Sequence, residues 1–279
     1  MVVRRSRDRS YAGRRPMSLL SRTIMFSSML LVAFVILVPF GYVFVASMQV
    51  LGKSGLSWGN WSQLFETVPV ARYMGNSAIL SISAAVMVVL LSSAAGFGFA
   101  KLRFPGSQII LVFCAATIAV PVISVIIPEY VNFGKAGLLN TYPGTVLVYV
   151  AFNLGLGTFF FASYFRSLPD SLMESAIVDG ASYVRTYWRI MLPLAVPAIM
   201  TVGVLVFIVV WNDLLTALLF MPGLSTRTIA VALATLTSER VNNLGEVTAG
   251  ALMSAVPTVL VYVFFQRYLV RGLTLGAVQ

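Results

Sequence analysis

The sequence predicts an all-α integral membrane protein that crosses the bilayer six times. Of its 279 residues, 59% are hydrophobic and only 10% are charged, and the mean hydropathy is +0.92, far from the balance of a soluble domain. The apolar residues occur in blocks separated by short polar segments, and a helix needs about 20 apolar residues to cross the hydrocarbon layer. We therefore expect one membrane domain.

The predicted spans follow one another along most of the chain, at residues 23–47, 74–100, 108–128, 144–165, 194–220 and 247–266. The first follows a basic run, but its apolar stretch is too long for a secretory signal, so we expect it to remain as a span. Three parts result. They are a basic tail over residues 1–20, expected to be disordered in isolation and attracted to anionic lipid, a membrane domain over 21–266, and a C-terminal tail over 267–279.

The distribution of Lys and Arg predicts the orientation, because these residues are retained on the cytoplasmic side. If the N-terminus is inside, fourteen lie on the inner side and five on the outer side. The inner set is Arg4, Arg5, Arg7, Arg9, Arg14, Arg15, Arg22, Lys101, Arg103, Arg166, Arg185, Arg189, Arg267 and Arg271, and the outer set is Lys53, Arg72, Lys135, Arg227 and Arg240. Both termini and the loops near 101–107 and 166–193 are therefore predicted to be cytoplasmic.

Several classes of function are excluded by composition. The net charge of +10 is spread over loops and one tail, so topology explains it better than a nucleic-acid partner does. The chain has no His and a single cysteine, Cys114, which rules out histidine chemistry and an intramolecular disulfide. Gly52, Lys53 and Ser54 imitate the end of a phosphate-binding loop, but Ser47 stands where that loop needs Gly. We expect no enzyme, no ATP site, no cofactor and no metal site in this chain.

The loop over residues 166–193 is long for a connection between membrane helices and is predicted to be helical. Ser171, with Glu174 three residues later, forms a capping-box pattern that predicts a helix start near Leu172. Gly180 can take the left-handed conformation that ends a helix after about two turns.

One face of this short helix is predicted to form a compact apolar knob, made of Leu172, Met173, Ala176 and Ile177. The knob either docks on a partner or lies on the membrane surface, and the pattern leaves both readings open. The next helix is expected to start after Ser182, and Pro193 to mark its entry into the fifth span.

A set of residues in this loop resembles the EAA loop of ABC-importer permeases, namely Glu174, Ser175, Ala176, Gly180, Ile190, Leu192 and Pro193. The spacing agrees at every motif position, with Ser175 in place of the usual Ala. Three further segments resemble the maltose-type, carbohydrate branch of these permeases: FAKLRFPG at 99–106, WNDLL at 211–215 and FQRYLVRGLTLGAV at 265–278.

The resemblance implies a type I ABC importer permease fold in a bacterial cytoplasmic (inner) membrane, and a role for two segments. The helix that begins near Ser171 would be the coupling helix, seated in a cleft of a cytoplasmic ATPase subunit. The tail would reach the ATPase dimer through Arg271, Gly272, Leu273 and Gly276, although its pattern alone also fits a basic membrane anchor. The implied partners are a second permease, two ATPase subunits that bind ATP and Mg, and an extracytoplasmic solute-binding protein.

Four polar or aromatic residues inside predicted spans are candidates for a substrate pathway: Asn153, Trp211, Asn212 and Asp213. Amide and carboxylate groups suit sugar hydroxyls, and an indole suits the apolar face of a sugar ring. For any one of them, hydrogen bonding between helices is an equally physical explanation, because polar groups are costly in hydrocarbon.

The resulting hypothesis is a permease subunit of an ATP-driven carbohydrate importer, with three alternatives. The cargo can be a polyol or a glycerol phosphate instead of a sugar. An ion-coupled secondary transporter would need intramembrane ionisable groups, and Asp213 is the only acidic residue in a predicted span. A membrane scaffold that transports nothing is the third.

Overall fold

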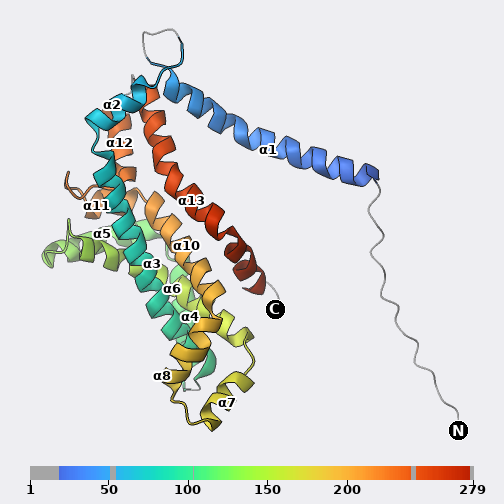
Figure 1. The fold of residues 1–279 in the computed structure, drawn as a ribbon. Helices are drawn as coiled ribbons and strands as arrows, with labels where there is room; N and C mark the ends of the chain where they lie inside the picture. Colours follow the sequence, from blue (N-terminus) through green and yellow to red (C-terminus); the bar gives the residue numbers. More distant parts are fainter. Residues whose placement is uncertain (1–18, 51–54, 103, 240–242, 277–279) are drawn as a thin grey trace.

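The structure is a computed structural model in which residues 19–50, 55–102, 104–239 and 243–276 are described. Residues 1–18 of the basic tail, the phosphate-loop mimic at 52–54 and residues 277–279 lie outside this part. The described residues form helices joined by short loops (Figure 1): α1 (Leu19–Met48), α2 (Gly59–Thr67), α3 (Val70–Lys101), α4 (Ser107–Ala116), a 3₁₀ turn η1 (Thr117–Ala119), α5 (Val122–Lys135), α6 (Tyr142–Ser167), α7 (Ser171–Val178), α8 (Tyr183–Thr186), a π-helical turn η2 (Tyr187–Met191), α9 (Leu192–Leu194), α10 (Val196–Asn212), α11 (Leu215–Phe220), α12 (Ile229–Glu239) and α13 (Leu244–Gly276).

Among the described residues, four helices are long and apolar enough to cross a membrane, and up to six spans result if two bent pairs are each counted as one span. The four are α1, α3, α6 and the Leu244–Leu269 part of α13. The protein is therefore a multi-pass membrane protein, as the hydropathy pattern predicts. Helices satisfy their backbone hydrogen bonds internally, which hydrocarbon requires.

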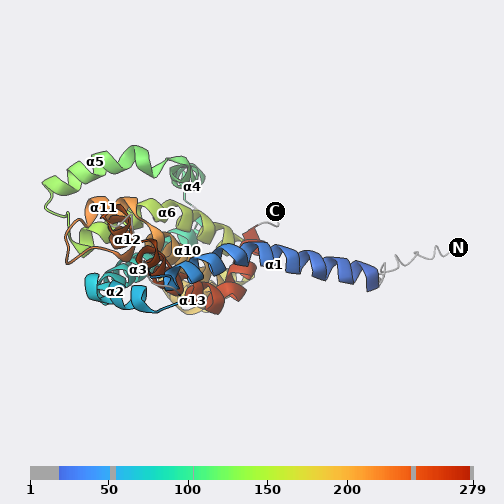
Figure 2. The ribbon, with the colours of Figure 1, turned by 90° about the horizontal axis from the view of Figure 1, so that it is seen from above.

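The third predicted span, 108–128, is not one straight helix. The arm Ser107–Ala119 meets α5 at an angle of 97°. Val120 is extended (φ −78°, ψ 117°), as a residue before proline favours, and Pro121 has no amide to continue the helix. The prediction of a simple span was therefore wrong in its geometry, and seen from above the α4–α5 pair runs along one side of the bundle (Figure 2).

The fifth predicted span, 194–220, is shorter than the sequence indicates and is bent at its start. The arm Tyr183–Leu194 meets α10 at 75°, beside Pro193 and Pro197, which both lack an amide donor. At its other end α10 stops at Asn212 because Asp213 is extended (φ −72°, ψ 126°), and the remaining residues form the separate helix α11.

The break at Asp213 is stabilised by its own side chain. The Asp213 carboxylate accepts a hydrogen bond from the backbone N–H of Ala217 at 3.1 Å, in the first turns of α11. The same oxygen accepts a hydrogen bond from the Tyr149 hydroxyl of α6 at 2.9 Å. A backbone interruption is tolerated at membrane depth where such partners replace the lost helix bonds.

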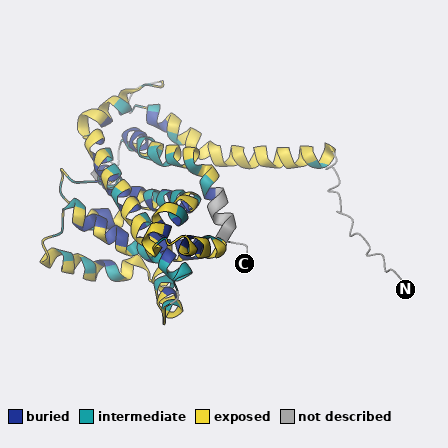
Figure 3. Cartoon of the chain, turned by 60° about the horizontal axis from the view of Figure 1, so that its bottom comes forward, coloured by how far each residue is buried: buried dark blue, intermediate teal, exposed yellow. Residues whose placement is uncertain are grey.

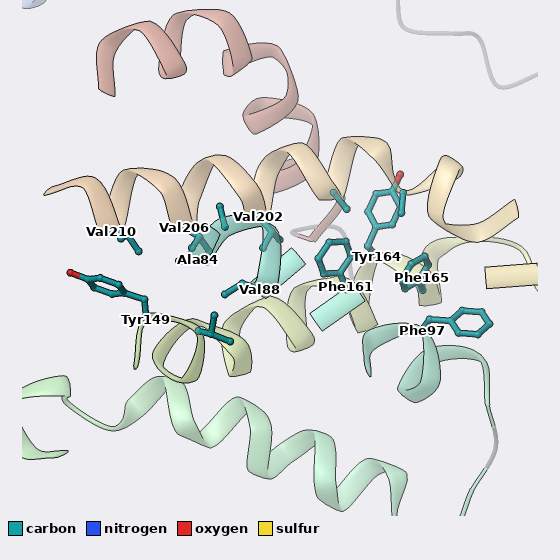
Figure 4. Packing of buried hydrophobic residues seen from close by; sticks show 14 of the residues in the cluster. Ala84, Val88, Phe97, Tyr149, Phe161, Tyr164, Phe165, Val202, Val206 and Val210 are labelled. Atoms are coloured by element: carbon teal, nitrogen blue, oxygen red, sulfur yellow. The ribbon is translucent and has the colours of Figure 1, made fainter. Parts of the chain in front are cut away.

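The bundle is organised by α3, α6 and α10, which pack side by side around one apolar cluster. Figure 4 shows Val88 of α3, Phe161 and Phe165 of α6 and Val202 of α10 pointing toward one another. The backbones of α3 and α6 approach closely: a Cβ on Gly96 would lie 2.6 Å from the Phe161 Cβ and 2.8 Å from the Ala162 nitrogen. Small residues permit this contact, which drives helix association in lipid.

A second cluster lies at the end of the bundle where α3 begins, and α2, α12 and α13 form it together with α3 and α10. At the opposite end of α3 lie α7 and α8 (Figure 1). The first helix, α1, projects away from the bundle, and its buried residues are Ala46 and Ser47. Figure 3 shows the rest of its length as exposed, so α1 meets lipid or another protein over most of its surface.

The close contact between α3 and α6 generates a first prediction. Gly96→Ala should lower the thermal unfolding midpoint of the purified protein, because the added methyl group meets backbone; overpacking of this kind costs about 1–3 kcal/mol. Gly98→Ala is the matched control, since nothing lies within 4 Å of a Cβ there. Equal midpoints for the two variants would show that the close approach is unimportant for stability.

A second prediction concerns the break between α10 and α11. Asp213→Ala removes the acceptor of both hydrogen bonds and should destabilise the fold by about 1–3 kcal/mol, the cost of leaving such groups unpaired. Asp213→Asn keeps a carbonyl oxygen and should retain most of the stability. Thermal unfolding of the three proteins measures this, with Asn212→Ala, whose side chain is exposed, as the neighbouring control. An unchanged midpoint for Asp213→Ala would mean that other contacts hold the break.

Candidate functional site

The α7 segment, residues 166–193, forms the end of the bundle beyond the last turns of α3 and α6 (Figure 1). Helix α6 ends at Ser167, and Leu168 is extended (ψ 137°) because Pro169 follows it. The chain then turns directly into α7, which has 8 residues. The predicted short helix is present at the predicted place.

The start of α7 differs from the expected capping box. Asp170 already has helical angles (φ −67°, ψ −25°), and its carbonyl accepts hydrogen bonds from the N–H groups of Met173 and Glu174. Ser171 is therefore the first helical residue instead of the cap, and no side chain caps this helix start. The capping-box prediction was wrong because the helical turn begins one residue earlier than the sequence pattern indicates.

The end of α7 agrees with the prediction. Gly180 has φ +74°, in the left-handed region. Its N–H donates to the Ile177 carbonyl and the Ala181 N–H donates to the Ala176 carbonyl, both at 2.9 Å. This pair of bonds is the Schellman arrangement, which satisfies the last carbonyls of a helix and turns the chain sharply.

The predicted apolar knob is divided between two faces of α7. Met173 and Ala176 are buried by the rest of the chain, and Met173 belongs to the main apolar cluster with Phe97 and Tyr187. Ile177 is 48% exposed. The inward face therefore seats the helix on the bundle and leaves the other face free for a partner.

The arm that follows α7 contains the rest of the motif. The Ser182 hydroxyl accepts a hydrogen bond from the Arg185 N–H at 3.3 Å and caps α8, as predicted. Ile190 lies in the π-helical turn η2, and Leu192 and Pro193 lie in α9. A π-helical turn is uncommon and occurs frequently at functional sites.

We define the α7 patch as the exposed large apolar side chains on α7, α8 and η2. They are 48–86% exposed, with Val178 the most exposed, and comprise Ile177, Val178, Tyr183, Val184 and Trp188. Large apolar side chains gathered at one end of a molecule mark an interaction surface. The sequence analysis identified the helix but missed Val178 and the contribution of the arm, because only the structure separates the buried face from the open one.

Two of the candidate pathway residues tie α10 to α13. Trp211 is 3% exposed, its indole N–H donates to the Ser254 carbonyl at 3.0 Å, and its ring stacks on Phe207. Its ring therefore has no open face for a sugar. The Asn212 amide donates to its own helix and to the Thr258 hydroxyl at 3.3 Å, and Asn212 is exposed.

The other two candidates, Asn153 and Asp213, each form a hydrogen bond with Tyr149, a residue that the sequence analysis missed. Tyr149 donates to Asp213 through its hydroxyl, and its backbone carbonyl accepts from the Asn153 amide at 2.8 Å. Asp213 and Asn153 therefore bond different parts of Tyr149, and the Asp213 carboxylate also stabilises the helix break. The sequence does contain a signal for Tyr149: it lies four residues before the candidate Asn153, and this spacing places both residues on one face of a helix.

A buried carboxylate in α13 also escaped the sequence analysis. Glu246 is 0% exposed, and its carboxylate accepts hydrogen bonds from the Thr67 hydroxyl at 2.6 Å and the Asn243 amide at 3.2 Å. Since it lies in the candidate span Leu244–Leu269, Asp213 is not the only acidic residue in a span. Within the described residues, no group of three or more Cys, Asp or Glu is arranged to hold a metal.

The predicted contact residues of the C-terminal tail continue the last helix. Arg271, Gly272, Leu273 and Gly276 lie in α13, which runs unbroken to Gly276. The side chains of residues 270–276 lie outside the described part.

Comparison with known proteins gives the family. The profile described as binding-protein-dependent transport system inner membrane component matches residues 89–275. The chain is similar to the osmoprotective compounds uptake permease protein GgtD of Synechocystis sp., with 30% identity over 270 residues and 90% of each chain covered. It is also similar to the trehalose/maltose transport system permease protein MalG of Thermococcus litoralis, with 31% identity over 271 residues, 93% of this chain and 98% of the relative.

The fold is also known from a solved structure. A chain of a bacterial ABC transporter involved in the import of the acidic polysaccharide alginate superposes with a TM-score of 0.75 and 21% identity, and the match covers 91% of this chain and 99% of the other. These matches confirm the resemblance noted in the EAA loop, and with it the expectation of a membrane transport component instead of an enzyme. The chain belongs to the family of inner membrane components of binding-protein-dependent transport systems.

Proposed function

We propose that this chain is one of two permease subunits of an ATP-driven carbohydrate importer and that α7 couples it to a separate ATPase. The observation that supports this most directly is the α7 patch, an exposed apolar surface built on the family's motif at one end of the bundle. A helix of 8 residues is not stable alone in water, so α7 needs the bundle on one face and gains from a groove on the other.

The coupling residues divide by role in this proposal. Val178 and Ile177 enter the ATPase cleft, because they are the open apolar side chains of α7. Ala176 is small because it is buried, and Gly180 ends the helix. The other motif residues, Ser171, Glu174, Ser175, Ile190, Leu192 and Pro193, form the helix surface and the arm that carry these contacts, and the tail residues Arg271, Gly272, Leu273 and Gly276 add a second contact.

The topology of the proposal is six spans with both termini in the cytoplasm of a bacterial cell, across its inner membrane. Each bent pair then counts as one span. Lys101, Arg166 and Arg185 lie in or beside the α7 end, whereas Arg72 lies at the start of α3 and Arg227 just before α12, near the other end (Figure 1). This separation supports a cytoplasmic α7, since basic residues accumulate on the inner side.

The proposed partners are a second permease, two ATPase subunits and an extracytoplasmic solute-binding protein. The ATPase subunits bind ATP and Mg. The family's description as binding-protein-dependent supports the last partner. The second permease is supported by the exposed apolar surface of α1, which far exceeds what a bundle helix leaves open.

A carbohydrate is the proposed cargo because the similar MalG carries trehalose and maltose by name and the alginate importer has the same fold. The name of GgtD, an osmoprotective compound permease, keeps a polyol as the alternative. Among the four pathway candidates, we favour Asn212 as a contact for the cargo, because its side chain is exposed on α10. A carbohydrate needs such neutral hydrogen-bonding groups.

The rival mechanisms have less support. An ion-coupled transporter needs an ionisable group open to the driving ion. Asp213 is bound to Tyr149 and Ala217, and Glu246 is fully buried among Thr67 and Asn243, so both carboxylates serve the fold. A scaffold would have no need for a coupling motif. The proposed mechanism is alternating access, in which closure of the ATPase dimer on ATP moves α7 and turns the cavity between permeases outward.

The cargo and the energy source can be tested together. In a complex co-purified with its ATPase and reconstituted in lipid, one sugar presented with its binding protein should stimulate ATP hydrolysis, and a panel of sugars and polyols identifies which. A purified complex without any ATPase, or uptake that follows an ion gradient without ATP, would contradict the proposal. Stimulation by a polyol alone would correct the cargo and keep the mechanism.

The docking role of α7 is tested by surface and backbone changes. Val178→Asp should abolish co-purification of the ATPase, because it places a charge in the cleft without touching the bundle. Gly180→Pro should have the same effect, since proline cannot adopt φ +74° and removes the N–H that bonds Ile177. Leu224→Asp, at another exposed apolar residue (69% exposed) near the opposite end, should retain the ATPase. Full ATPase recovery with Val178→Asp would exclude this helix as the contact.

A further inference from the structure

A lysine at the end of α3 joins that helix to the start of α7. The Lys101 ammonium donates to the Leu168 carbonyl at 2.7 Å and to the Asp170 carboxylate at 2.6 Å. Lys101 is the last residue of α3, and Asp170 immediately precedes α7. Charge-assisted hydrogen bonds of this length are among the stronger contacts in proteins.

The burial of this ion pair is one-sided. The Lys101 side chain is 3% exposed, whereas the Asp170 side chain is 75% exposed. An exposed ion pair contributes little, but an ammonium that is largely removed from water requires partners to remain charged. The geometry therefore fixes Asp170 and Leu168 relative to α3 more firmly than a surface pair would.

The other side of α7 is also attached to α3. The hydroxyl groups of Ser93 and Tyr187 are 2.7 Å apart and both residues are buried. The Tyr187 ring lies 5.3 Å from the Phe97 ring, centre to centre. Since Tyr187 begins η2, beyond α8, the last turns of α3 hold the chain both before and after α7.

We propose that Lys101 is a positioning residue that holds α7 on the end of α3, so that α7 and α3 move as one body. The transport consequence rests on the proposed function. A short helix between two loose connections would tilt against the bundle under load, whereas two ties to one helix transmit a displacement. Helix α3 packs along α6 and α10, so the ties connect the coupling helix to the core of the bundle.

The first test measures whether Lys101 holds α7 in place, and it needs no partner protein. In the full chain in lipid nanodiscs, hydrogen–deuterium exchange of the α7 amides should become about 10-fold faster with Lys101→Met, which keeps a buried apolar stem and removes the charge. Lys101→Arg should restore slow exchange, since it can still donate to both oxygens. Lys135→Met is the matched control: Lys135 is also the last residue of a helix, but it is exposed and far from α7.

The second test measures ATP hydrolysis and uptake in the assembled transporter. Lys101→Met should retain the ATPase and its basal ATP hydrolysis but lose most of the stimulation by sugar and binding protein, and uptake with it. Lys101 itself is too buried to touch the ATPase, so the effect cannot arise from a lost docking contact. Should Lys101→Met fail to accumulate, Asp170→Ala removes the acceptor at the exposed end of the same contact.

The outcomes separate this inference from the proposed function. Unchanged exchange in α7 for Lys101→Met, or for Asp170→Ala in its place, overturns the proposed attachment whatever the transporter carries. Faster exchange with normal stimulation and uptake shows a contact that plays no part in coupling, and also overturns the inference. If the wild-type complex shows no stimulation, the proposed function fails, and the exchange measurement still decides whether Lys101 positions α7.

Discussion

The structure depends on the close contact of α3 with α6. Lipid tails are as apolar as the helix surfaces, so there is little hydrophobic gain when two spans meet, and packing must hold them together. Gly96 against Phe161 and Gly157 against Ser92 bring the two backbones near enough for continuous contact. Helix α10 then packs on this pair and completes the apolar cluster. The outer helices and the α7 segment pack on this unit of three helices, and their positions depend on it.

The polar groups inside the bundle mostly serve the places where its helices break or begin. Asp213 and Tyr149 stabilise the interruption between α10 and α11, and Glu246 joins the start of α13 to α2 through Thr67. Each group satisfies donors that hydrocarbon would leave unpaired. An intramembrane carboxylate commonly indicates transport chemistry. Here the hydrogen-bond partners show that both carboxylates serve the fold. Asn212 also forms hydrogen bonds, but its side chain is exposed.

The sequence predicted what local chemistry decides. Apolar runs located the four long apolar helices, Gly180 located the end of α7, and Ser182 located the start of the next helix, because each of these signals acts within a few residues. The angles of the bends at Pro121 and Ala195 could not be predicted from the sequence, since proline permits a kink but neighbouring helices decide its angle. The contacts of Trp211 with Ser254 and of Lys101 with Asp170 join residues far apart in sequence. The periodicity of a single helix does not predict such pairs.

The division of α7 into two faces explains the chemistry of its motif. A docking helix that used all its apolar residues for the partner would have none to hold it on its own bundle. Met173 and Ala176 are buried against the bundle, whereas Ile177 and Val178 are exposed on the outer face. Ser175, on the exposed side, tolerates a hydroxyl that Ala176 would not. The motif therefore describes how a short helix is held on its own bundle. In the proposed function, the strength of this attachment determines how far a force applied to the outer face of α7 is transmitted into the bundle.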